Sequence, residues 1–215
     1  MGELEILKNV LKQQNRFILD LMNDPRIPEE IKNEYAVVIP LIKVGENWSI
    51  IYEVRAKSLK RQPGEISFPG GKVENGESHR QAALREAMEE LNLKEDNINI
   101  IGELDYLVAR DNTTIYSFLA IIENMDINHI KWNKDEVDHI FTVPIEFLVA
   151  NEPKPYYIEL RPAINNDFPY NLIPNGKDYN WRTGKESVYF YIYKDYVIWG
   201  YTAKMTKRFI DIIKE

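Results

Sequence analysis

Three glutamates on one short segment are the residues best suited to chemistry in this sequence. Glu86, Glu89 and Glu90 stand at positions i, i+3 and i+4, so a helix would project them from one face. Carboxylates held this close repel one another unless a cation lies among them. Because oxygen ligands without cysteine or neighbouring histidine suit hard divalent ions, the trio favours Mg²⁺ or Mn²⁺ over Zn²⁺. The alternative is a helix face whose acids are simply in solvent, and the spacing alone does not decide between them.

The segment that carries the glutamates has the features of a helix with one apolar face. Ser78 followed by Gln81 is a capping-box pattern, which predicts that a helix begins near Ser78. Apolar residues recur at i, i+3, i+4 and i+7, and these are Leu84, Ala87, Met88 and Leu91. At about 100° per residue the glutamates point roughly away from this apolar face. One face is therefore expected to pack on the protein and the other to gather carboxylates.

The complete pattern over residues 71 to 93 resembles the Nudix box, G-x5-E-x7-R-E-U-x-E-E-x-G-U, where U is apolar. The fixed positions that match are Gly71, Glu77, Arg85, Glu86, Glu89 and Glu90. On average compositions, such a match arises by chance about once in ten million starting positions. Asn92 stands where the family usually has glycine. Asn is the other residue that best tolerates left-handed backbone, so we expect the turn that ends the helix to survive.

This resemblance implies an α/β (α+β) Nudix fold, in which a mixed β-sheet is sandwiched between α-helices, and hydrolysis of a diphosphate linked to another moiety. It also implies a set of metal ligands, namely the side chains of Glu86, Glu89 and Glu90 and a backbone carbonyl at Gly70 or Gly71. Arg85 would orient Glu86, and Glu77 would brace the loop against the helix. Divalent ions suit this reaction because they neutralise charge on the phosphate oxygens and activate the attacking water.

A second signature precedes the first. Residues 55 to 71 resemble the motif of coenzyme A pyrophosphatases of the Nudix family, roughly R-[SA]-x3-R-x3-G-x3-F-P-G-G, and the matching residues are Arg55, Ala56, Gly64, Phe68, Pro69, Gly70 and Gly71. Lys60 takes the second arginine position and Arg61 follows it, which keeps the charge but not the bidentate geometry of arginine. The resemblance implies substrate contacts from Arg55, Lys60, Arg61 and Phe68. A basic cluster in an acidic chain suits the extra 3′-phosphate of coenzyme A, although an ordinary solvated loop is the alternative.

Two downstream stretches, residues 135–144 and 198–203, also resemble segments of the family. They extend the resemblance to about residues 36–214. Glu136 is a candidate carboxylate outside the box, as a metal ligand or a base, with a solvent-exposed loop acid as the alternative. Near the end of the chain, we expect Trp199 in the core and Gly200 at a close approach of backbone.

Apolar periodicity predicts the elements around these motifs. The expected helices are 3–22, 145–150 and 201–214, and the expected strands are 36–42, 48–54, 98–109, 113–123, 137–143, 188–193 and 196–199. Five prolines make residues 151–185 a long loop without regular structure. Its aromatic residues could cover a ligand or anchor the loop, and we expect anchoring; they are Tyr156, Tyr157, Phe168, Tyr170, Tyr179 and Trp181.

Composition excludes several classes of function. The 215 residues suit one domain over 1–215, and 27 basic against 34 acidic residues give a net charge of −7, which disfavours a general nucleic-acid binder. The absence of cysteine excludes disulfides and thiolate chemistry. With no signal peptide or membrane-spanning run, we expect a cytoplasmic protein without membrane partners. The helix at 3–22 could pack on the sheet or form a homodimer interface.

We therefore predict metal-dependent hydrolysis of coenzyme A or its thioesters to 3′,5′-ADP and 4′-phosphopantetheine or its acyl derivative. One alternative is a Nudix pyrophosphatase for another nucleoside diphosphate, such as ADP-ribose, a dinucleotide or a damaged nucleotide. Another is a non-catalytic Nudix module that senses a nucleotide or binds a protein. Isomerisation of a prenyl diphosphate on the same fold lacks the cysteine that such chemistry uses by family analogy.

Overall fold

The computed structural model describes residue 31 and residues 33–215, and its centre is a hairpin of two long apolar strands. β1 (Asn33–Val44) and β2 (Asn47–Arg55) pair antiparallel, with Leu41 opposite Ile50. Their β-branched residues favour extended backbone, and their side chains are buried on both faces of the sheet. The hairpin predicted from the two apolar stretches is confirmed.

Six further strands complete a mixed sheet around the hairpin, and they are β3 (Ile66–Ser67), β4 (Gly70–Lys72), β5 (Ile98–Glu103), β6 (Leu107–Val108), β7 (Thr113–Ile122) and β8 (Val137–Pro144). The order is β3-β2-β1-β7-β5, with β8 also on β2, β4 on β1 and β6 on β7. β7 runs parallel to β1, which makes the sheet mixed. The single strand expected over 98–109 is two strands, β5 and β6, which both pair with β7; between them the Asp105 carbonyl accepts from the Ser117 side chain instead of from a strand backbone.

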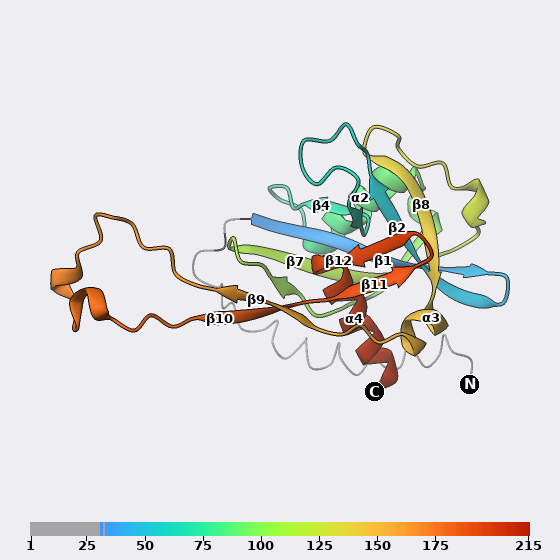
Figure 1. The fold of residues 1–215 in the computed structure, drawn as a ribbon. Coiled ribbons are helices and arrows are strands. Elements are labelled where there is room, and N and C mark those ends of the chain that lie inside the picture. The colour runs from blue at the N-terminus through green and yellow to red at the C-terminus, as the bar shows by residue number, and fades with distance from the viewer. Residues whose placement is uncertain (1–30, 32) are drawn as a thin grey trace.

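Two helices cover opposite faces of this sheet, α2 (His79–Leu91) and α4 (Gly200–Lys214) (Figure 1). Successive residues of β2 show the two faces, since side chains alternate along a strand. Ile51 joins the core under α2. Tyr52 joins the core under α4, where its hydroxyl lies 2.9 Å from Thr206 Oγ1. The expected mixed sheet between helices is confirmed.

The remaining short elements connect these layers. They are α3 (Ile145–Ala150), the strands β11 (Phe190–Tyr193) and β12 (Tyr196–Trp199), and the 3₁₀ helices η1 (Glu95–Asn97), η2 (Ile127–His129), η3 (Tyr170–Leu172) and η4 (Gly176–Asp178). α3 follows Pro144, as predicted. Within residues 33–215, no helix is long and apolar enough to cross a membrane. The helix predicted for residues 3–22 falls outside the described residues.

The proline-rich stretch is more regular than we predicted. β9 (Tyr156–Leu160) and β10 (Gly184–Val188) pair as an antiparallel ribbon, and with η3 and η4 they form an arm that extends away from the sheet (Figure 1). The expectation of a loop without regular structure was wrong because all the prolines flank the strands. A proline outside a strand costs no hydrogen bond of the ladder. The prolines are Pro153, Pro155, Pro162, Pro169 and Pro174.

The aromatic residues of the arm pack mainly on one another. Near the tip, the rings of Phe168 and Trp181 have centroids 5.5 Å apart, and those of Tyr179 and Trp181 are 4.9 Å apart. Closer to the body, Tyr156 and Tyr157 are 60% and 64% exposed. The anchoring that we expected therefore acts within the tip of the arm.

Two expectations about the end of the chain were wrong. Trp199 is 44% exposed and stacks on Phe190, whereas its neighbour Ile198 is buried, because β12 turns alternate residues outward. A Cβ built on Gly200 meets no atom within 4 Å, so no backbone approaches it closely. Its φ of +64° instead explains the glycine, since this backbone conformation disfavours residues with a Cβ.

Both predicted ends of α2 are confirmed. Ser78 and Gln81 form a reciprocal capping box at its start. At its end, Asn92 adopts left-handed backbone, with φ 49° and ψ 47°, and its N–H donates to the Met88 carbonyl. Asparagine thus serves in the position where glycine is usual in the box.

Substitution of Asn92 should reveal the cost of this backbone conformation. Because Asn92 is exposed, Asn92→Ala changes little besides backbone preference and should lower the free energy of unfolding by about 1 kcal/mol. Asn92→Gly should be at least as stable as the natural chain. Urea denaturation of the three proteins measures this order. An alanine variant as stable as the glycine variant would contradict it.

Candidate active site

Arg85 joins the loop before α2 to the helix itself. Its guanidinium donates to both carboxylate oxygens of Glu77, from Nε at 3.2 Å and from Nη2 at 2.8 Å. Its Nη1 donates to Glu86 Oε1 at 2.8 Å. The bidentate contact lowers the pKa of Glu77 and raises that of Arg85. These are the contacts that the resemblance implied, with Glu77 bracing the loop and Arg85 orienting Glu86.

The two glycines before the helix allow the carboxylates to lie against the sheet. A Cβ on Gly71 would lie 2.2 Å from the carboxylate of Glu86. A Cβ on Gly70 would lie 2.4 Å from the carbonyl oxygen of Ala36 on β1. The N–H of Gly70 donates to Glu90 Oε2 at 2.7 Å. The glycine pair therefore holds Glu86 and Glu90 at the junction of α2 and the sheet.

The three helix glutamates differ in burial, which the sequence did not predict. Glu90 is 4% exposed, the side chain of Glu86 is 18% exposed, and that of Glu89 is 56% exposed. Burial, followed by repulsion from neighbouring carboxylates, raises the pKa of Glu90, and burial raises that of Glu86. The helix is rotated from its expected orientation because the small side chains of Ala82 and Ala83 lie fully buried against the sheet.

Glu53 is a carboxylate of the site that sequence reasoning missed. It lies on β2 and is 0% exposed. Ser67 Oγ donates to its Oε1 at 2.8 Å, while its Oε2 has no hydrogen-bond partner. Burial raises the pKa of Glu53, and Glu136 and Glu86 raise it further. The available signal was a single acid inside the apolar run of β2, at a position that shares the α2 face with Ile51.

Glu136 lies beside these carboxylates. Its backbone carbonyl accepts from the N–H of Ala56 at 2.8 Å, which joins the loop before β8 to the end of β2. Its negative charge contributes to the raised pKa values of Glu53, Glu86 and Glu90. Glu136, the candidate that the sequence singled out beyond the box, therefore belongs with Glu53, Glu86 and Glu90. We call these four carboxylates the acidic group.

The segment that carries Arg55, Lys60 and Arg61, called the basic loop below, begins next to this acidic group. Arg55 ends β2, and its backbone pairs with Glu65 and Gly64 across the base of the loop. Lys60 and Arg61 are exposed on the loop, and neither forms an ion pair with another described residue. Both side chains are therefore without an ionic partner among residues 33–215.

Phe68 does not belong to the substrate contacts that the resemblance implied. It is 2% exposed, and its ring stacks on that of Tyr52 with centroids 5.0 Å apart. Side chains alternate along the chain here, so Ser67 faces Glu53 while Phe68 turns into the core under α4. We correct its role to core packing.

The donor set of the acidic group fits a hard divalent cation. Carboxylates from β2, α2 and the loop before β8 influence one another's pKa values, and the chain has no cysteine, so the donors available here are oxygens. The unpartnered Oε2 of buried Glu53 is an oxygen that a cation would satisfy. Among residues 33–215, no three acidic or histidine side chains stand at the positions of a completed metal site, so the fit rests on this donor chemistry.

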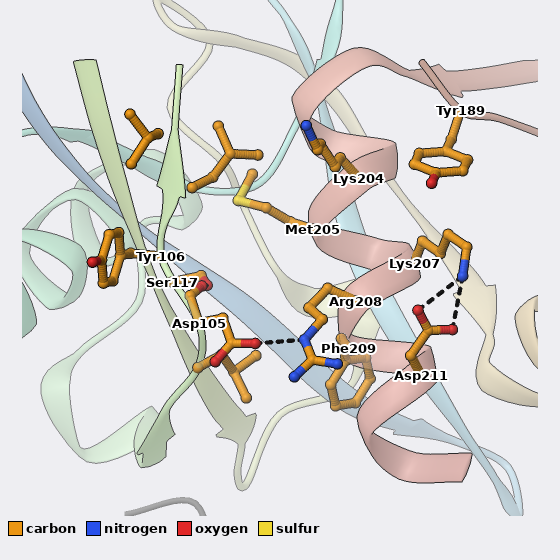
Figure 2. A pocket seen from close by; sticks show the side chains of 13 residues that line it. Asp105, Tyr106, Ser117, Tyr189, Lys204, Met205, Lys207, Arg208, Phe209 and Asp211 are labelled. Atoms are coloured by element: carbon orange, nitrogen blue, oxygen red, sulfur yellow. Dashed lines mark hydrogen bonds and ion pairs between the residues drawn. The ribbon is translucent and has the colours of Figure 1, made fainter. Parts of the chain in front are cut away.

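A cavity of about 400 Å³ lies elsewhere, between α4 and the segment that joins β5 to β6 (Figure 2). Its charged side chains form ion pairs, which are Arg208 with Asp105, Lys207 with Asp211 and Lys204 with Glu186. Because these charges neutralise one another, we place the chemistry at the acidic group instead.

Three curated relatives share about a third of the aligned residues with this chain. Nudix hydrolase 3 of Caenorhabditis elegans is 32% identical over 53% of this chain and 48% of its own. Two proteins of Mus musculus follow: peroxisomal coenzyme A diphosphatase NUDT7 is 33% identical over 63% and 56%, and mitochondrial coenzyme A diphosphatase NUDT8 is 32% identical over 56% and 59%. The chain spans about half the length of the curated relatives it matches.

Solved structures of Nudix proteins show a more distant likeness. A MutT/nudix family protein from Enterococcus faecalis is 16% identical, with a TM-score of 0.48 over 100% of this chain and 76% of its own. A binary complex of a C. elegans Ap4A hydrolase is 21% identical, with a TM-score of 0.45 over 55% of this chain and 85% of its own. At this level neither likeness bears on activity.

The family match covers the segment that holds the acidic group. The model of the NUDIX domain matches residues 34–165, which is more than half of the 215 residues. That range contains the glycine pair, Arg85 and every glutamate of the site. This chain therefore belongs to the NUDIX domain family.

Proposed function

We propose that this chain hydrolyses the diphosphate of coenzyme A or its thioesters with the aid of Mg²⁺ or Mn²⁺. The observation that carries the proposal is the meeting of buried carboxylates with an exposed basic loop at the end of β2. An acidic group suits divalent cations, and free cationic side chains suit phosphates. The names of the two mouse relatives, both coenzyme A diphosphatases, support the choice of substrate.

The proposed roles follow from the contacts of each residue. Glu86, Glu89 and Glu90 would hold the metal, together with a backbone carbonyl at Gly70 or Gly71. A bound divalent cation would neutralise charge on the phosphate oxygens and lower the pKa of an attacking water. Arg85 fixes the carboxylate of Glu86 by a direct hydrogen bond at 2.8 Å.

Two groups outside the box would act on the substrate. Glu136 would serve as a metal ligand or as the base that accepts the proton of the water. In the basic loop, Arg55, Lys60 and Arg61 would contact phosphate groups, with the 3′-phosphate of coenzyme A as the distinguishing one. If these three side chains do not bind the 3′-phosphate, the substrate is another nucleoside diphosphate.

Several expectations from the sequence stay predictions. They are a single domain over 1–215, a cytoplasmic location, a homodimer, and the absence of nucleic-acid and membrane partners. The printed names of the two mouse relatives include a peroxisomal and a mitochondrial location, so the compartment of this chain needs its own measurement.

Loss of one exposed metal ligand should abolish turnover without loss of the fold. Glu89→Gln should reduce kcat by two or more orders of magnitude, since the carboxylate would hold the metal while its exposed side chain contributes little to packing. Glu95→Gln, an exposed acid on η1, is the matched control and should keep full activity. Steady-state kinetics with circular dichroism measures both. Normal turnover in folded Glu89→Gln protein would show that the catalytic metal is bound without Glu89.

Removal of the 3′-phosphate should test the substrate. We expect kcat/KM for coenzyme A to exceed that for 3′-dephospho-coenzyme A and for ADP-ribose by about tenfold or more, which corresponds to one charge-assisted contact of about 1.4 kcal/mol. Mass spectrometry of the products in ¹⁸O-water identifies the attacked phosphorus. Equal kcat/KM for coenzyme A and 3′-dephospho-coenzyme A would show that the basic loop does not bind the 3′-phosphate.

The buried charge of Glu90 should make metal-free stability depend on pH. Its raised pKa means that protonated Glu90 favours the folded state, so this contribution is complete below the ordinary value of 4.5 and is lost as pH rises through the folded-state value. As pH rises from about 5 to about 9 in EDTA, the free energy of unfolding should fall in both proteins. The fall should be smaller in Glu90→Gln than in the natural chain, by at least about 1 kcal/mol. Urea denaturation across this range measures the difference. Parallel pH profiles would contradict the assignment.

A further inference from the structure

The sheet contributes a buried carboxylate to the acidic group, and the roles above leave it unused. Glu53 stands between Tyr52 and Val54 in the buried part of β2, opposite Ile140 on β8. Strand alternation directs it to the α2 face of the sheet, the face on which Glu90 is buried. Glu53 pairs with Ser67 across β2 and β3, and Glu90 accepts from the N–H of Gly70 three residues further along, so one short segment contacts both carboxylates.

Each of these two carboxylates has one oxygen held by the protein. Ser67 Oγ donates to Glu53 Oε1 at 2.8 Å, and the N–H of Gly70 donates to Glu90 Oε2 at 2.7 Å. Glu53 Oε2 is buried and has no partner. A buried carboxylate without a counter-charge is costly, so an ion or a proton must compensate it.

The cationic side chains nearby do not supply that counter-charge. Arg85 donates to Glu77 and Glu86. Arg55 attracts Glu53 electrostatically, yet the two form no ion pair within 4.0 Å, and Arg55 Nε is itself buried without a partner. Within the described residues, Glu53 therefore has a hydroxyl donor but no cation in contact.

We infer that Glu53 is a further metal-binding carboxylate of this site, which holds a divalent cation together with Glu90 from the sheet side of α2. The inference rests on the metal site of the proposed function and adds a ligand outside the Nudix box. It also has a structural consequence: the cation would bind β2 to α2, so metal binding would stabilise the packing of the helix on the sheet.

The test counts bound Mn²⁺ on the full chain by electron paramagnetic resonance, without substrate. Glu53→Gln keeps an oxygen that can accept from Ser67 but removes the charge. We expect this variant to bind one Mn²⁺ fewer than the natural chain, or to bind it at least tenfold more weakly. Glu103→Gln is the matched control, because burial also raises the pKa of Glu103 on β5 but no carboxylate of the acidic group acts on it. It should bind Mn²⁺ as the natural chain does.

A conservative variant keeps the inference testable if Glu53→Gln does not fold. Glu53→Asp retains the charge on a shorter side chain, so it should bind Mn²⁺ more tightly than Glu53→Gln and at least tenfold more weakly than the natural chain. If either folded variant binds Mn²⁺ in the natural number and affinity, Glu53 is a protonated structural acid and the inference is overturned.

The outcomes separate this inference from the proposed function. If the natural chain hydrolyses no diphosphate but loses a bound Mn²⁺ in Glu53→Gln, the proposed activity fails and the metal role of Glu53 stands. If the natural chain is active and Glu53→Gln binds Mn²⁺ normally, the activity stands and the inference fails. When both hold, kcat of Glu53→Gln should fall by about 10-fold to 100-fold.

Discussion

The close contact between the Gly70-Gly71 segment and α2 is the constraint on which the site depends. The carboxylate of Glu86 occupies the space that a side chain on Gly71 would need. Gly70 has no room for a side chain because β1 lies directly against it, and its N–H binds Glu90 at 2.7 Å. A Cβ on Gly71 would displace the carboxylate of Glu86, and a Cβ on Gly70 would collide with the backbone of β1.

The charges at this junction do not balance within the described residues. Arg85 is shared by Glu77 and Glu86, which fixes the geometry of the loop and of one carboxylate. Glu53 and Glu90 are more deeply buried and rely on neutral donors. Neutral hydrogen bonds offset only part of the cost of a buried charge. This arrangement fits the divalent cation that we propose for the site.

Local signals predicted the helix and the hairpin well, and they failed where packing was decisive. The caps of α2 at Ser78 and Asn92 depend on residues within a few positions, so the sequence contains all that is needed to predict them. The arm of β9 and β10 was missed because its prolines are frequent in composition but lie outside the strands. Trp199 was placed in the core from its size, whereas the alternation of β12 turns it outward.

The sequence by itself determined the spacing of the glutamates on α2, the glycine pair and the charge of the loop, because each of these is set by residues that are neighbours in the chain. Only the tertiary structure decided that Glu53 and Glu136 join the group, that Phe68 leaves it, and that Glu90 is buried while Glu89 is not. These outcomes depend on which strand face meets which helix face. That pairing brings together residues far apart in sequence, and no local pattern records it.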